Sequence, residues 1–257
     1  TPVGASRPLT LDHINFTGKA LQLFGVSTIT LDMAVLTGQP NLHLGLSIGP
    51  LPKDLQVTQP LSLVRHAEFS LLPIEIEPLL RFLPPSPGVG LGKARLEAKL
   101  NLDTPAEAGQ LSLNASVAAR GLVLEDDGST RPQAERRGQP VDVRLETRLS
   151  AALLPGDVKL EKLQLLVNDM DVSAEAQLQN LWTAPAVSKL NVSSRGFTLE
   201  RLVAAVPPTA LPPGAVLQGP LVVKGAASGS PTAAQVELMI DLTPATVRIP
   251  TFNKPAD

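Results

Sequence analysis

The residues best suited to chemistry are few in this chain and lie far apart. It contains three histidines, His13, His43 and His66, and no cysteine. No histidine has a second histidine or a carboxylate at the spacing of a metal site, and thiolate chemistry is excluded. His43 stands between Leu42 and Leu44. Successive side chains of a strand point to opposite faces, so a strand here would place His43 on the polar face, opposite the leucines, and we predict that it is solvated.

Two acidic clusters have the residue type that calcium prefers, Asp169 with Asp171 and the three acids at 125–127. Calcium takes six or more converging oxygen ligands, and neither cluster supplies them locally. The glycine-rich segment 88–92 leads into a predicted strand. It therefore lacks the helix N-terminus that holds a phosphate, and we predict a bend there. We expect no enzyme activity, no metal and no cofactor.

Composition narrows the class of protein further. The formal net charge is -2 and aromatic residues make up 3% of the 257 residues, which argues against nucleic-acid binding. Hydrophobic residues reach 43%, so the chain can bury apolar surface and is not compositionally disordered. No apolar run approaches the roughly 20 residues that cross a bilayer. If a membrane anchor exists, we expect it outside this chain.

Strict alternation of apolar and polar residues is the dominant pattern. It is clearest at 93–103, KARLEAKLNLD, and recurs throughout, for example at 29–35, 42–48 and 236–242. Alternating side chains give a strand one dry and one wet face, and such strands are typical of antiparallel sheets. We predict an all-β fold with about a dozen strands, in a long, highly curved antiparallel sheet that forms an open hydrophobic groove.

Two short segments, at 76–83 and 199–206, have the apolar spacing of helices and end at double prolines. Glu77 precedes Glu200 by 123 positions, and the same offset relates the apolar residues and prolines that follow, Leu79, Leu80, Leu83, Pro84 and Pro85, to Leu202, Val203, Val206, Pro207 and Pro208. We interpret the chain as a single elongated segment, 1–257, with internal repeats at about 9–124 and 141–250. The hydrophilic stretch between them, 125–140, is predicted to be an exposed loop. The apolar side chains that we expect the two helices to bury are Leu79, Leu80, Leu83, Leu202, Val203 and Val206.

The stretch 160–206 resembles a known family. It reads LEKLQLLVNDMDVSAEAQLQNL, then a proline-marked turn at 182–185, then KLNVSSRGFTLERLVAAVPP. This order of two strands, a proline turn, a strand, a short helix and Leu/Val-Pro is similar to that of the AsmA-like proteins of Gram-negative envelopes. The segment from Phe69 to Pro84 looks similar, with extra prolines at Pro73 and Pro78.

The resemblance implies a lipid-binding groove that guides phospholipid acyl chains across the periplasm, between inner and outer membrane. It also implies inner- and outer-membrane protein partners. The inward positions are mostly Leu, Val and Ala, which line a channel without filling it as aromatic side chains would. The residues predicted to line the groove are Leu96, Ala98, Leu100, Leu102, Leu111, Leu113, Ala115, Val117, Val143, Leu145, Val172, Ala174 and Leu178. The alternative is a structural or adhesive β-repeat with a closed core, which binds only protein partners.

Overall fold

The computed structural model describes most of the chain. The described residues are 11–19, 24–51, 63–80, 89–104, 109–126, 137–152, 156–212, 214–230 and 232–249.

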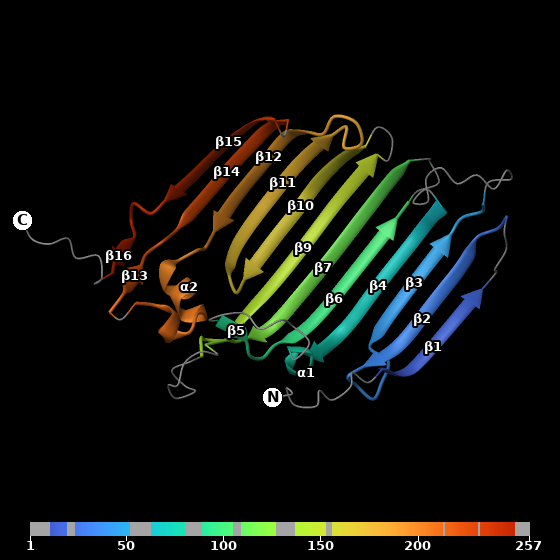
Figure 1. Ribbon diagram of the computed structural model, residues 1–257, viewed down its shortest axis with the longest axis horizontal. Coiled ribbons are helices and arrows are strands. Elements are labelled where there is room, and N and C mark those ends of the chain that lie inside the picture. Colours follow the sequence, from blue (N-terminus) through green and yellow to red (C-terminus); the bar gives the residue numbers. More distant parts are fainter. Residues whose placement is uncertain are drawn as a thin grey trace, which may run out of the picture.

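Twelve strands form one unclosed antiparallel sheet, seen face-on in Figure 1, and each strand pairs with the next one in the order β1-β2-β3-β4-β6-β7-β9-β10-β11-β12-β14-β15. The first six are β1 Leu11–Lys19, β2 Ser27–Val35, β3 Leu42–Ile48, β4 Val64–Glu75, β6 Arg95–Asp103 and β7 Gln110–Leu122. The other six are β9 Val141–Ala152, β10 Asp157–Val167, β11 Met170–Gln179, β12 Ala186–Arg195, β14 Val222–Ser230 and β15 Ala233–Asp241. The predicted all-β antiparallel fold is confirmed.

Short turns join several of the strands. The segment 37–40 connects β2 to β3, and Asn168 with Asp169 connects β10 to β11. The backbone of Asn168 is left-handed, with a positive φ, a conformation that asparagine tolerates better than most residues. These short connections are the reason that neighbouring strands in sequence are also neighbours in the sheet.

Register shifts interrupt many of the strand pairs. Of the eleven neighbouring pairs in the sheet, eight contain such an irregularity. Between β7 and β9 the shift lies between Ala119 and Leu122, where Gly121 adopts a φ of 63°. Such bulges bend a strand and increase its local twist.

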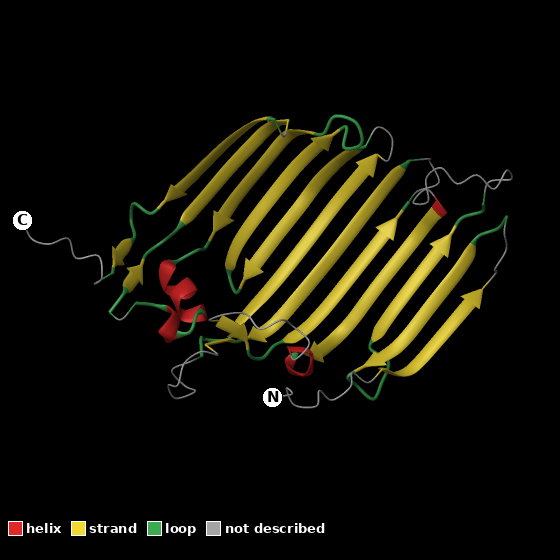
Figure 2. Cartoon of the chain, in the orientation of Figure 1, coloured by secondary structure: helices red, strands yellow, loops and turns green. Residues whose placement is uncertain are grey.

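The small elements gather at one end of the sheet, which we call the helix end, where β4, β7, β12 and β15 finish (Figures 1 and 2). Both predicted helices are present, as α1 Glu77–Leu80 and α2 Leu199–Ala205, and a 3₁₀ turn, Pro208–Ala210, follows α2. Two short ribbons lie beside them. They are β5 Val89–Leu91 with β8 Leu124–Asp126, and β13 Val216–Gln218 with β16 Thr246–Arg248.

Two predictions about this end are wrong. The glycine-rich segment is not a bend, because Val89–Leu91 forms strand β5 and pairs with β8. The stretch 125–140 is not an exposed loop over its whole length: Glu125 belongs to β8, and its carboxylate lies 2.6 Å from Arg137 Nε. Both side chains are at least half-buried, since the ion pair lets two charged groups leave bulk water together. Residues 127–136 lie outside the described residues.

Burial is also concentrated at the helix end. The buried hydrophobic residues of the described chain are Ala34, Leu71, Ile74, Ala94, Val141, Met170 and Ala176. All except Ala176 lie at or near the ends of strands on this side. The sheet otherwise consists of a single layer, so most of its apolar side chains are only half-buried.

The helices are less buried than predicted. Leu202, Val203 and Val206 are half-buried, and α2 contains no fully buried residue. α2 has only seven residues, and the described element that it mainly contacts is the short strand β13. Leu79 is also half-buried, whereas the side chain of Leu80 and residue Leu83 lie outside the described residues.

Candidate functional site: an open aliphatic face

The strand register places one apolar surface across the whole sheet, which we call the aliphatic face. Successive pairings connect one residue of each strand in an unbroken row. The row is Phe16, Leu31, Leu44, Phe69, Leu100, Ala115, Thr147, Leu163, Ala174, Val192, Gly225 and Leu238. Only Thr147 in this row has a polar side chain. The row therefore extends over the full width of the sheet, from one edge strand to the other.

All the residues predicted to line the groove lie on this face. Leu100 pairs with Ala115, Leu102 with Leu113, and the neighbouring rows continue in the same way. On β9, Leu145 lies between Val117 and Leu165. On β11, Leu178 lies beside Val158 of β10. Because side chains on one face of a sheet recur every second residue, residues far apart in sequence share one surface.

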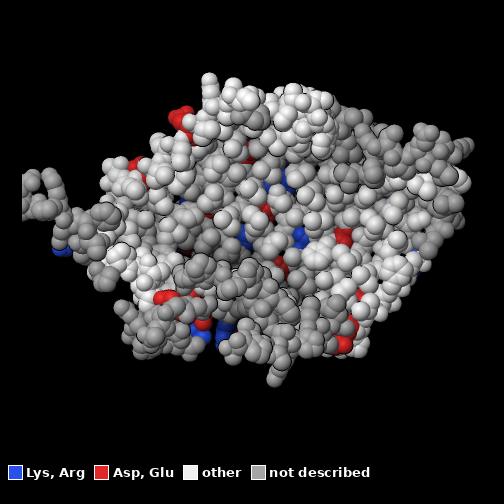
Figure 3. All heavy atoms as spheres, in the orientation of Figure 1, with Lys and Arg blue, Asp and Glu red and all other residues white. Residues whose placement is uncertain are grey.

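Away from the helix end, no described element forms a second layer over the aliphatic face (Figures 1 and 2). Even on interior strands, Val117 retains 41% of its exposure and Leu145 38%. In the view of Figure 3 the described surface is mostly uncharged, with a few Lys, Arg, Asp and Glu side chains scattered over its middle. An exposed apolar surface of this extent is unusual for a protein monomer and marks an interaction site.

On the opposite side of the sheet, which we call the polar face, polar side chains of neighbouring strands contact one another. Glu146 of β9 lies 2.6 Å from Lys162 Nζ of β10 and 2.5 Å from Arg144 Nη2. The hydrogen bond from Lys162 is the main reason that the pKa of Glu146 lies below its usual value. Ser173 and Ser193 hydroxyls are 3.0 Å apart across β11 and β12.

A chain of alternating acids and histidines crosses four strands of the polar face, and we call it the acid–histidine network. His43 Nδ1 lies 2.6 Å from Asp32 Oδ1, and His43 Nε2 lies 3.0 Å from Glu68 Oε1. The other oxygen of Glu68 is 3.7 Å from His66 Nε2, and His66 Nδ1 is 2.7 Å from Asp103 Oδ1. His43 lies on the polar face, as predicted, but it is hydrogen-bonded to two carboxylates and is not solvated by water alone.

The carboxylates raise the pKa of both histidines. For His43 the largest cause of the raised pKa is the hydrogen bond to Asp32, followed by that to Glu68. For His66 it is the hydrogen bond to Asp103. A carboxylate at hydrogen-bond distance favours the charged imidazolium, since it stabilises the positive charge.

The network was missed in the sequence because its hydrogen-bonded partners come from different strands, well separated along the chain. The one available signal was that all five residues occupy polar positions of alternating segments. The side chains extend across the strands instead of converging on one point. Among the described residues, no group of three or more His, Asp or Glu is arranged to hold a metal ion.

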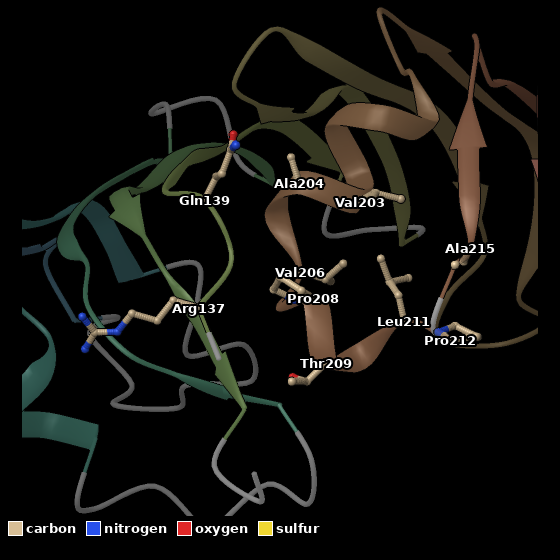
Figure 4. A pocket seen from close by; sticks show the side chains of 11 residues that line it. Arg137, Gln139, Val203, Ala204, Val206, Pro208, Thr209, Leu211, Pro212 and Ala215 are labelled. Carbon is tan, nitrogen blue, oxygen red and sulfur yellow. The ribbon is translucent and has the colours of Figure 1, made fainter. Parts of the chain in front are cut away.

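A hollow of about 710 Å³ lies beside α2 at the helix end (Figure 4). Val206 and Leu211 point towards its interior, and Arg137 extends away from α2. Gln139 N–H donates to the Ala204 carbonyl at 2.7 Å, which joins the segment before β9 to α2. A Cβ on Gly138 would come within 2.2 Å of the Ala205 carbonyl oxygen, so only glycine allows this close approach.

Comparison with known proteins gives no relative: no protein-family model, no curated protein and no solved structure matches the chain. Within the described part of the chain, every helix is too short or too polar to cross a bilayer.

Proposed function

We propose that the aliphatic face binds the acyl chains of phospholipids or similar lipids. In this proposal the chain is a segment of an AsmA-like protein that guides lipid across the periplasm between the inner and outer membranes. The observation that carries the proposal is the row of paired residues across all twelve strands, which is apolar except at Thr147 and Gly225 and has no described layer over it.

The chemistry of the face suits a hydrocarbon chain. Leu, Val and Ala side chains offer dispersion contacts and no hydrogen bonds, so they contact methylene groups without fixing their orientation. Removing a methylene group from water stabilises binding by about 0.8 kcal/mol, and by less where only one side is covered. Affinity would then be spread over many contacts, and a bound chain could slide, because no single residue holds it.

The proposed shape is a curved sheet built from two repeats. The register shifts in eight strand pairs support bending, because bulges increase strand twist. The order strand, helix, short strand, strand, strand, short strand occurs twice, from β4 to β8 and from β12 to β16. In both cases the first short strand after the helix pairs with the last one.

Lipid headgroups would stay at the open margin of the groove, in water, and membrane proteins would deliver and accept the lipid. The polar face would contact the aqueous periplasm. Catalysis plays no part in this proposal.

The first test is native mass spectrometry of the purified chain. Co-purified phospholipid, present in repeated preparations, is the expected result. A lipid-free mass in every preparation would favour the alternative function, a structural β-repeat whose aliphatic face is covered by protein.

A pair of adjacent substitutions then separates the two faces. Leu100→Glu places a carboxylate on the aliphatic face between Phe69 and Ala115, where it should strongly reduce lipid occupancy. Lys99→Glu is the matched control, since Lys99 lies one residue away on the polar face between Ser70 and Ser116. Labelled phospholipid bound to each folded variant is measured after circular dichroism. Full occupancy in Leu100→Glu would contradict the proposal.

A further inference from the structure

A hollow of about 230 Å³ lies on the polar face, over the middle of the sheet, and we call it the cationic hollow. Residues of β6, β7, β9 and β10 surround it, and each of these strands pairs with a described strand on both sides. The hollow therefore lies away from the margins of the sheet. The strand register places most of its polar side chains in two adjacent rows, one with Lys99, Ser116 and Glu146 and the next with Asn114, Arg148 and Lys162.

The charges around the cationic hollow do not cancel. Among the described residues that line it, Glu146 is the only one with a carboxylate. Both of its oxygens are already paired, Oε1 with Arg144 at 2.5 Å and Oε2 with Lys162 at 2.6 Å. In the described part of the chain, neither Lys99 nor Arg148 forms an ion pair with a carboxylate. Four cationic side chains therefore surround one carboxylate, which leaves a net charge of +3 in a chain whose formal net charge is -2.

Arg148 is held in a way that leaves donors for an anion. Its Nε donates a hydrogen bond to the side-chain oxygen of Asn114 at 3.0 Å. This contact engages the oxygen of the Asn114 amide, so the amide nitrogen remains a donor. The two terminal nitrogens of the Arg148 guanidinium make no hydrogen bond to a described residue. A guanidinium with both terminal nitrogens available can bind phosphate or carboxylate through two parallel hydrogen bonds.

We propose that the cationic hollow binds a phosphate group, carried either by a small soluble phosphoester or by a lipid headgroup. A phosphate monoester has a charge of about −2 at neutral pH and three strong acceptor oxygens. These match the net charge of the hollow and its donors on several strands better than a carboxylate, which has one charge and two oxygens. The site lies on the face opposite the proposed acyl-binding surface, and it does not depend on the proposed function.

A second hollow on the polar face, of about 450 Å³, provides a matched comparison. It shares Arg148 with the cationic hollow, and its other charged residues are two cations and two carboxylates, Lys159, Lys189, Glu161 and Glu175. Lys159 Nζ lies 3.9 Å from Glu161 Oε1. Because these carboxylates compensate the lysines, the second hollow should attract a phosphate group much less than the cationic hollow does.

Titration of the full chain with inorganic phosphate at constant ionic strength, followed by NMR, tests the inference. We expect saturable shifts of the Asn114 side-chain amide and of the Arg148 Nε–H. Arg148→Gln should weaken phosphate binding at least about tenfold, because it removes charge-assisted hydrogen bonds. Lys189→Gln, in the second hollow, removes one positive charge as well and should leave the affinity within about twofold of the parent. Arg148 and Lys189 are exposed, so both variants should fold, which circular dichroism verifies.

Sedimentation with vesicles of phosphatidic acid in phosphatidylcholine distinguishes the two sources of the phosphate group. Vesicle binding that Arg148→Gln abolishes assigns the hollow to a lipid headgroup. Vesicle binding that is absent, or that Arg148→Gln leaves unchanged, assigns it to a soluble phosphoester once inorganic phosphate has been shown to saturate the site. The inference is overturned if inorganic phosphate causes no saturable shifts, or if Lys189→Gln weakens phosphate binding as much as Arg148→Gln does.

Discussion

The two faces of the sheet are built by the same strands but are stabilised in different ways. Polar side chains find partners within the sheet itself, as Lys162 does with Glu146 and Arg120 with Glu97. Apolar side chains gain stability only when their surface is removed from water, and neighbours within the same sheet leave the outer part of that surface exposed. The polar face is therefore complete within one chain, whereas the aliphatic face gains stability only where something covers it.

Substitutions in the covered part of the aliphatic face should lower the free energy of unfolding the most. Ile74→Ala removes a side chain that is 4% exposed at the helix end. It should lower the free energy of unfolding by about 3 kcal/mol. Its neighbour Glu75 lies on the polar face in an exposed ion pair with Arg95, so Glu75→Ala should lower the free energy of unfolding far less. Urea denaturation of both variants measures the difference. Equal losses would mean that burial does not stabilise this end.

The docking of α2 should give an intermediate effect. Gly138→Ala brings a methyl group against the Ala205 carbonyl. The displacement of α2 should then destabilise the protein by about 2 kcal/mol. Gly38→Ala is the matched control, because a Cβ there meets nothing within 4 Å. Thermal unfolding and hydrogen exchange of α2 are the measurements. Unchanged α2 protection in Gly138→Ala would show that α2 is not held by this contact.

Substitutions of the histidines on the polar face should change stability the least, and the change should depend on pH. His43 and His66 have a raised pKa in the folded state. Their contribution to stability is therefore complete below about pH 6.5 and is lost as pH rises through the raised values. The side chains are more than a third exposed, so solvent screening keeps each contribution below about 1 kcal/mol. The melting temperature should therefore fall slightly as the solution becomes alkaline.

The double variant His43→Gln/His66→Gln should show a smaller fall of the melting temperature with rising pH than the parent protein. His13→Gln, a histidine outside the acid–histidine network, should leave it unchanged. An identical pH dependence in the double variant and the parent would exclude the network as its source.

Local patterns predicted much of the fold. The alternation at 93–103 predicts a strand, and β6 runs from Arg95 to Asp103. The double proline after residue 206 predicts the end of a helix, and α2 ends at Ala205. The prediction of a bend at 88–92 was wrong because the glycines there hide any alternation of apolar and polar residues. The strand at Val89–Leu91 forms by pairing with β8, a segment distant in sequence.

The sequence by itself determined which side chains share a face, because a period of two is a local property of an extended backbone. It therefore also determined that the predicted lining residues, from Leu96 to Leu178, lie on one side of the strands. Only the tertiary structure decided which strands are neighbours and in what register, since that depends on hydrogen bonds between distant segments. That register unites His43, Glu68 and His66 in one network and joins the apolar rows of the described strands into a single face.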